Sequence, residues 1–282
     1  MKQASLLLFI LVALNAHFSW AQDYSRLKIY ANEFELSKLA NLGVAVDHGI
    51  HKEGVFFISD FSKAERQIMD SYDYTYEVLI EDVQAYYIEE LSKPAAKENN
   101  SVKNVSCPGS GSIGAGTTPT TPTHFNLGTM GGYLKYEEML AELDEMLATY
   151  PNLITAKAPI STFLTAQNRP LYHVRISDNP NIDESGEPKV LYTAIHHARE
   201  PMSLMETIFF MWYVLENYGT NPEITYIVNH MQLYFVPCIN PDGYVYNQTT
   251  NPNGGGMWRK NRRLNSGGSY GVDLNRNYSY GW

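Results

Sequence analysis

The sequence predicts an α/β protein in which a mixed, largely parallel sheet flanked by helices is preceded by a small α+β domain of ferredoxin-like topology. Three observations support this prediction. Residues 190–195 and 232–239 are continuous apolar runs, typical of strands buried on both faces, and a helical pattern separates them. Residues 22–92 carry strand and helix patterns in the order βαββαβ. Between these regions, residues 108–123 are rich in Gly, Ser, Thr and Pro, which is typical of a linker.

The small domain is expected to span residues 22–92. Asn32 is a candidate cap for its first helix, which Gly43 would terminate. Ser62 is a candidate cap for the second helix, because Glu65 follows it three residues later and completes a capping box. The expected strands are residues 27–30, 44–46, 55–58 and 74–80, and the expected helices are residues 32–40, 62–69 and 82–91.

The second unit, residues 126–282, is expected to be built on a βαβ unit, which implies parallel strands covered by helices. Pro201 suits the first turn of the crossover helix, whose apolar side chains recur at helical spacing to about Asn217. We interpret that aromatic-rich stripe as core packing. Residues 93–125, between the units, are expected to form a flexible linker exposed to proteases. The expected strands are residues 171–176, 190–195 and 232–239, and the expected helices are residues 137–150, 201–217 and 222–229.

The N-terminus predicts export. Lys2 precedes an apolar run at residues 5–14, which is shorter than the roughly 20 residues that span a bilayer. Ser19 and Ala21 are small residues at positions suited to cleavage after residue 21. Residues 1–21 are therefore expected to be a signal peptide, with a buried N-terminal helix as the alternative. The mature protein is expected to be secreted or periplasmic, monomeric and without a membrane span.

Composition excludes several classes of protein. The 282 residues are 44% hydrophobic and 18% charged, as in folded soluble proteins, and the formal net charge of −9 argues against a nucleic-acid partner. The two cysteines, Cys107 and Cys238, form no CxxC pair, which argues against redox or structural-zinc roles. Cys238 lies in an apolar strand and is expected to be a buried thiol, although export also permits a disulfide with Cys107.

His197 and Glu200 are the first candidates for chemistry. An imidazole nitrogen and a carboxylate three residues apart can converge on one metal ion, and both are ligands of Zn²⁺. They directly follow a predicted buried strand, and sites in open α/β sheets gather at the carboxyl ends of strands. The spacing alone also fits a surface ion pair on a helix, so it does not decide between the two.

Four segments in order resemble the zinc carboxypeptidases. They are HHARE at residues 196–200 followed by Pro201, NPDGY at residues 240–244, MWRK at residues 257–260, and GVDLNRN at residues 271–277. The resemblance covers residues 126–282 and implies part of a carboxypeptidase-like domain. It also implies a zinc-dependent metallocarboxypeptidase, a hydrolase that removes C-terminal residues from peptides and proteins with one Zn²⁺ ion.

The resemblance assigns roles to individual residues. His197 and Glu200 would be two of the three protein ligands to zinc. Arg259 would be catalytic, because a fixed cation near the scissile carbonyl stabilises the developing oxyanion. The residues implied to bind the terminal carboxylate of the substrate are Arg199, Asn275 and Arg276.

Other polar residues near these segments receive structural interpretations. His196 is expected to point away from its neighbour and to support the site, and His173 alternates on a strand and is expected to pack. Asp273 is expected to support its loop rather than act as a base. No ligand pattern includes His48, His51, His124 or His230.

The sequence departs from the family after residue 230. No histidine follows His230, so the family's third zinc ligand is expected beyond the end of this chain, together with its general-base glutamate. We therefore expect the 282 residues to be an inactive fragment of a longer reading frame, and a naturally short, non-catalytic peptide-binding relative is the alternative. Residues 22–92 resemble the inhibitory pro-segments of some secreted carboxypeptidases, with a spacer or folding aid as the other interpretation.

Overall fold

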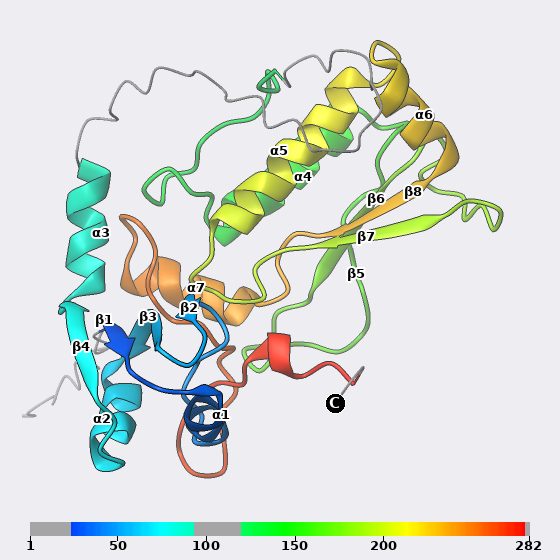
Figure 1. The fold of residues 1–282 in the computed structure, drawn as a ribbon. Coiled ribbons are helices and arrows are strands. Elements are labelled where there is room, and N and C mark those ends of the chain that lie inside the picture. Colours follow the sequence, from blue (N-terminus) through cyan, green and yellow to red (C-terminus); the bar gives the residue numbers. More distant parts are fainter. Residues whose placement is uncertain (1–23, 93–119, 280–282) are drawn as a thin grey trace, which may run out of the picture.

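A computed structural model describes residues 24–92 and 120–279, which form two sheets, each with its own hydrophobic core (Figure 1). The expected signal peptide, most of the expected linker and Cys107 lie outside the described residues. Cys238 is a buried free thiol, as expected. Within the two described ranges, no helix is both long and apolar enough to cross a membrane.

The N-terminal unit is a four-stranded antiparallel sheet in the order β2-β3-β1-β4. The βαββαβ order predicted from the sequence is confirmed, and one further helix follows it. The core lies between this sheet and the first two helices, and Leu27, Leu39 and Phe61 are fully buried in it. The elements are β1 (Tyr24–Ile29), α1 (Glu33–Asn41), β2 (Ile50–Lys52), β3 (Phe56–Ser62), α2 (Lys63–Ser71), β4 (Tyr76–Ile80) and α3 (Val83–Ser92).

Capping boxes fix the starts of α1 and α2. The Asn32 side chain accepts a hydrogen bond from Glu35 N, and Glu35 Oε2 accepts one from Asn32 N at 2.8 Å. Ser62 and Glu65 make the same reciprocal pair at α2. Each box satisfies two backbone donors that a helix start leaves without partners, so both predicted caps are confirmed.

The strand predicted at residues 44–46 is wrong. Gly43 adopts a φ of +87°, and Val44 N donates to Leu39 O at 3.0 Å, which closes the end of α1. Val44 is buried in the core without joining a ladder, so its apolar character reflects packing. The second strand is instead β2, Ile50–Lys52, which pairs with β3. Residues 42–49 therefore form a connection between α1 and β2.

The second unit is a four-stranded mixed sheet in the order β5-β6-β8-β7. The predicted βαβ unit is confirmed, because β7 and β8 pair in parallel with a helix between them. The pairings of β5 with β6 and of β6 with β8 are antiparallel, so the described sheet is mixed rather than largely parallel. The elements are α4 (Tyr136–Thr149), β5 (Ala158–Pro159), β6 (Tyr172–Ile176), β7 (Lys189–Thr193), α5 (Met202–Asn217), α6 (Pro222–His230), β8 (Gln232–Val236), α7 (Pro241–Thr250) and the 3₁₀ helix η1 (Leu274–Arg276).

The two predicted buried strands differ in burial. β8 lies between two neighbours, and Leu233 and Phe235 are fully buried, as predicted. β7 lies at the edge of the described sheet, and Leu191 is 65% exposed, so the prediction that it is buried on both faces is wrong. An apolar run shows that a residue suits a sheet; it does not show how many faces the neighbouring elements cover.

Helices α4 and α5 lie side by side across the sheet (Figure 1). Trp212 of α5 donates from Nε1 to Glu142 Oε2 of α4 at 2.6 Å, and both side chains are buried. The end of the predicted linker also contacts α5, because Glu216 accepts hydrogen bonds from Thr123 N and His124 N. Residues 123 and 124 are therefore held against the second unit.

Candidate active site

The site begins where the parallel strands β7 and β8 end. The carboxyl ends of parallel strands lie at the same edge of a sheet, so the segments that follow them meet. Ile195 turns the chain after β7 with a φ of +51°, which is rare for a β-branched residue and costs about 1–3 kcal/mol. It is 1% exposed, and its N–H donates to Ser203 Oγ at 3.1 Å, so packing and hydrogen bonding hold the turn.

The NPDGY segment joins the other motif segments. Asn240 donates from Nδ2 to His196 O at 3.2 Å and to Arg259 O at 3.4 Å, and Ala198 N donates to Arg259 O at 3.0 Å. Gly243 permits this approach, because a Cβ there would lie 2.8 Å from the Cβ of Ala198. Asn240 Oδ1 also accepts from Gly243 N and caps α7, a helix that the sequence analysis did not predict.

His197 and Glu200 are in direct contact. His197 Nδ1 lies 2.9 Å from Glu200 Oε1 and 3.0 Å from Oε2. His197 is 2% exposed, and its Nε2, 3.3 Å from Asp273 Oδ1, has no hydrogen-bond partner in the described part of the chain. A buried imidazole beside a carboxylate, with ring nitrogen capacity unused, fits a zinc ion in donor type and in separation.

Charge on this pair is strongly biased. Burial alone would lower the pKa of His197, but interactions with the carboxylates of Asp273 and Glu200 outweigh it and raise that pKa above its usual value. Burial would raise the pKa of Glu200, but the His197 and Arg259 charges hold it below its usual value. Glu200 is therefore an ionised carboxylate, and a metal ion at His197 would replace a proton.

Arg259 completes the cluster from another segment. Its guanidinium is 4% exposed; Nε donates to Asp273 Oδ2 at 3.0 Å, and Nη2 donates to Asp47 Oδ2 at 2.5 Å. Nη1 lies 3.6 Å from Glu200 Oε1 and makes no hydrogen bond to any described residue. Burial would raise the pKa of Asp273, but interactions with His197 and Arg259 hold it far below its usual value. Asp273 thus supports the positions of both residues, as the sequence analysis expected.

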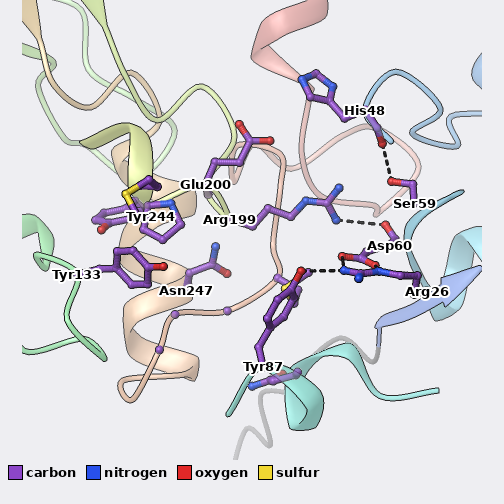
Figure 2. A pocket seen from close by; sticks show the side chains of 18 of the residues that line it. Arg26, His48, Ser59, Asp60, Tyr87, Tyr133, Arg199, Glu200, Tyr244 and Asn247 are labelled. Atoms are coloured by element: carbon purple, nitrogen blue, oxygen red, sulfur yellow. Dashed lines mark hydrogen bonds and ion pairs between the residues drawn. The ribbon is translucent and has the colours of Figure 1, made fainter. Parts of the chain in front are cut away.

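The predicted carboxylate-binding residues are divided. Arg276 of η1 hydrogen-bonds Asp47 through Nη2, which brings it to the same carboxylate as Arg259. Asn275 donates its backbone N–H to Asp273 Oδ1 at 2.9 Å, and the residue is exposed. Arg199 points toward the N-terminal unit and donates to Asp60 O at 3.2 Å (Figure 2). The structure therefore groups Arg276 with Arg259 but leaves Arg199 and Asn275 outside that cluster.

Asp47 and His48 are site residues that the sequence analysis missed. Both lie in the connection between α1 and β2, within the N-terminal unit. His48 has ligand atoms within 4.8 Å of those of His197 and Glu200, so its assignment to no ligand pattern is wrong in space. No sequence signal marks the pair, because an Asp-His dipeptide in a loop gains meaning only when the two units dock.

The remaining predicted histidines have structural contacts. His196 Nε2 lies 2.7 Å from Tyr278 Oη, and burial together with the neighbouring His197 lowers its pKa. His173 Nδ1 lies 3.0 Å from Ala158 O on the adjacent strand, which supports a packing role.

A cavity of about 660 Å³ extends from this cluster between the two units. His48 and Arg26 line it from the N-terminal unit, and Glu200, Tyr244 and Asn247 line it from the second unit (Figure 2). Its size is in the range of small-ligand sites.

A family model described as zinc carboxypeptidase matches residues 139–282, which include every motif segment above. The chain belongs to the zinc carboxypeptidase family. A zinc carboxypeptidase of Saccharothrix mutabilis subsp. capreolus is 35% identical over 151 residues, or 54% of this chain and 33% of that protein. Carboxypeptidase A2 of Mus musculus is 30% identical over 211 residues, or 74% of this chain and 42% of that protein.

Solved carboxypeptidases share the fold. The carboxypeptidase A of Helicoverpa armigera matches 93% of this chain and 59% of that chain, with a TM-score of 0.63 and 21% identity. Thrombin activatable fibrinolysis inhibitor (TAFI) matches 92% of this chain with a TM-score of 0.56 and 21% identity. The prediction of a partial carboxypeptidase fold preceded by a small α+β unit is therefore confirmed. The zinc carboxypeptidase chain described here spans between a third and just over two fifths of the two curated relatives.

Proposed function

We propose that the protein containing these residues is a zinc-dependent metallocarboxypeptidase that removes C-terminal residues from peptides and proteins. The observation that carries the proposal is the direct contact of three side chains from two distant segments. Glu200 Oε1 lies 2.9 Å from His197 Nδ1 and 3.6 Å from Arg259 Nη1. A candidate metal pair and a buried cation with an unused donor thus face the same point, as peptide hydrolysis requires.

His197 and Glu200 would hold the zinc ion. When bound, zinc supplies a water of lowered pKa and polarises a carbonyl group. Asp273 would keep the His197 ring in place, since carboxylates beside metal-binding histidines fix the orientation of the ring. The buried Nη1 of Arg259 would donate to the oxygen of the scissile carbonyl as negative charge develops there, which is worth several kcal/mol in a site shielded from water.

Arg276 would bind the terminal carboxylate of the substrate, with Asn275 and Arg199 as further candidates. The Asp47 carboxylate supports this role, because it already makes hydrogen bonds with both Arg276 and Arg259. It represents the carboxylate of a substrate in the same position. A guanidinium presents two parallel N–H donors that match two carboxylate oxygens, which explains selection of a free C-terminus.

Residues 22–92 would act as an inhibitory pro-segment. Asp47 from that unit takes up the guanidinium groups that the substrate needs, so the docked unit and the substrate compete. Cleavage within residues 93–125 would release it, and residues 126–282 would belong to the catalytic domain. With residues 1–21 as a signal peptide, the enzyme would be secreted or periplasmic and monomeric.

The experiment uses the product of the complete reading frame, after cleavage in residues 93–125. We expect it to release the C-terminal residue from peptides with a free C-terminus, to leave the matching C-terminal amides intact, and to lose activity with a chelator. Arg259→Lys should lower kcat by about a hundredfold or more, because one fixed donor is lost in the transition state.

Two results would count against the proposal. Binding of free-acid peptides without any turnover would favour the alternative, a non-catalytic secreted peptide-binding relative. Turnover that a chelator does not reduce would remove zinc from the mechanism. Equal cleavage of uncleaved and cleaved protein would leave the enzyme in place and exclude the inhibitory role of residues 22–92.

A further inference from the structure

His48 lies against the candidate zinc ligands from the opposite unit. Its ring meets the His197 ring edge to face, with centroids 4.9 Å apart and planes at 84°. One ligand atom each from His48, His197 and Glu200 lies within 4.8 Å of the others. Ligand atoms around a tetrahedral zinc ion are about 3–4 Å apart, so small side-chain rotations suffice to gather all three.

The position of His48 is fixed from two sides. Its carbonyl oxygen accepts a hydrogen bond from Ser59 Oγ at 2.6 Å, which ties the connection to β3 (Figure 2). Asp47 Oδ2 lies 2.9 Å from His48 Nδ1, and a carboxylate at one ring nitrogen is the usual means of orienting a metal-binding histidine. The His48 side chain is 46% exposed, so it retains room to rotate toward an ion.

Asp47, His197 and Asp273 form a second group of suitable spacing. Both of its carboxylates are already engaged by guanidinium groups, Asp47 with Arg259 and Arg276, and Asp273 with Arg259. A cation placed there would have to compete with fixed positive charges on two sides. The group that contains His48 needs only one carboxylate, Glu200, and takes two neutral imidazoles, which suits zinc better.

We propose that His48 is a third protein ligand to the zinc ion held by His197 and Glu200, so that the N-terminal unit closes the site through the metal as well as through Asp47. The inference rests on the proposed zinc site. It implies that the metal strengthens docking of the N-terminal unit, and that docking strengthens metal binding, because the two events share one free energy of coupling.

Zinc affinity tests the ligand directly. The dissociation constant would be measured on the 282-residue chain by competition with a colorimetric chelator. We expect His197→Ala to abolish tight binding and His48→Ala to weaken it by at least about tenfold, the effect of losing one ligand of three. His51→Ala is the matched control, because His51 lies three residues further on and interacts with Glu33, and it should leave the constant unchanged. Circular dichroism confirms folding, and His48→Gln replaces the alanine variant if that one unfolds.

The outcomes separate the two proposals. If His197→Ala leaves zinc binding intact, the zinc site itself is wrong. If His197→Ala abolishes binding while His48→Ala matches His51→Ala, the zinc site stands and the role of His48 is overturned. With Co²⁺ in place of Zn²⁺, His48→Ala should also shift the visible absorption of the bound ion, and an unchanged spectrum would contradict ligation.

Amide hydrogen exchange tests the coupling. Zinc should slow exchange in residues 44–52 of the chain, and His48→Ala should remove that protection while leaving exchange in β6 unchanged. Exchange in residues 44–52 that does not respond to zinc would overturn the proposal, because a ligand to the metal cannot be indifferent to it.

Discussion

Asn247 and Trp258 are joined by two reciprocal hydrogen bonds. Asn247 Nδ2 donates to Trp258 O at 2.8 Å, and Trp258 N donates to Asn247 Oδ1 at 2.9 Å. The amide side chain thus takes the place of a neighbouring strand and fixes the backbone directly before Arg259. Asn247 is 1% exposed, so water cannot replace either bond.

Asn247→Asp is expected to lower the free energy of unfolding by at least about 3 kcal/mol. The carboxylate can still accept from Trp258 N, but it cannot donate to Trp258 O and would be buried without a cationic partner. Chemical denaturation measures the loss. Asn229→Asp is the control, because its Oδ1 only accepts a hydrogen bond from Tyr218 Oη, and we expect a change within about 0.5 kcal/mol. Equal losses in both variants would mean that the donor role of Asn247 is unimportant.

Features predicted correctly from the sequence were local or nearly so. Ser62 with Glu65 predicted a helix start because the capping box lies within four residues. His197 with Glu200 was recognised because the pair lies within one turn after a strand. The motif segments placed Arg259 near this pair, although the hydrogen bonds of Asn240 that join them required the structure.

The predictions that failed depended on what packs against a segment. Val44 is apolar because it fills the core after α1, and periodicity cannot distinguish that from a short strand. Leu191 belongs to a strand whose outer face no described element covers. Asp47 and Arg259 are 212 residues apart, and their contact exists only because two units dock. No pattern within either unit encodes such a contact.

Gly243→Ala sets helix propensity against packing. Within α7, alanine is favoured over glycine by about 1 kcal/mol. The added Cβ would lie 2.6 Å from Lys260 O and 2.8 Å from Ala198 Cβ, and a backbone oxygen cannot rotate away. We expect packing to win, with a net loss of about 1–3 kcal/mol in the free energy of unfolding and weaker zinc binding.

Gly267→Ala provides the matched control for this substitution. A Cβ there meets no atom within 4 Å, so we expect its unfolding midpoint and zinc affinity to stay within error of the parent protein. A Gly243→Ala protein more stable than its parent would show that the NPDGY segment moves freely against the Ala198 segment. The motif glycine would then owe nothing to close packing.

Glu216 should make stability depend on pH. Burial would raise its pKa, but backbone hydrogen bonds from Thr123 and His124 hold the pKa below its usual value. Because the folded pKa lies below the unfolded one of about 4.3, its contribution is complete above that pH and disappears as the pH falls through the folded pKa. Glu216→Ala should therefore cost about 1–3 kcal/mol near pH 7 and progressively less below about pH 4.

Urea denaturation of both proteins from pH 3 to pH 7 measures this difference. Glu206→Ala is the control, because Glu206 is exposed on the same helix and should show a small, pH-independent effect. A difference between the parent protein and Glu216→Ala that stays constant down to pH 3 would exclude the charged carboxylate as the source of the stabilisation.

Asp47→Asn tests whether this carboxylate stands in for a substrate. Removing its charge weakens the hydrogen bonds with Arg259 and Arg276, so a peptide carboxylate should compete more easily for both guanidinium groups. We expect a fluorescent peptide with a free C-terminus to bind about tenfold more tightly, or 1.4 kcal/mol, while its C-terminal amide binds as before. Asp73→Asn, an exposed position in the same unit, should change neither affinity. An equal gain for acid and amide would mean that Asp47 only blocks access, because a site built for carboxylates must distinguish the two peptides.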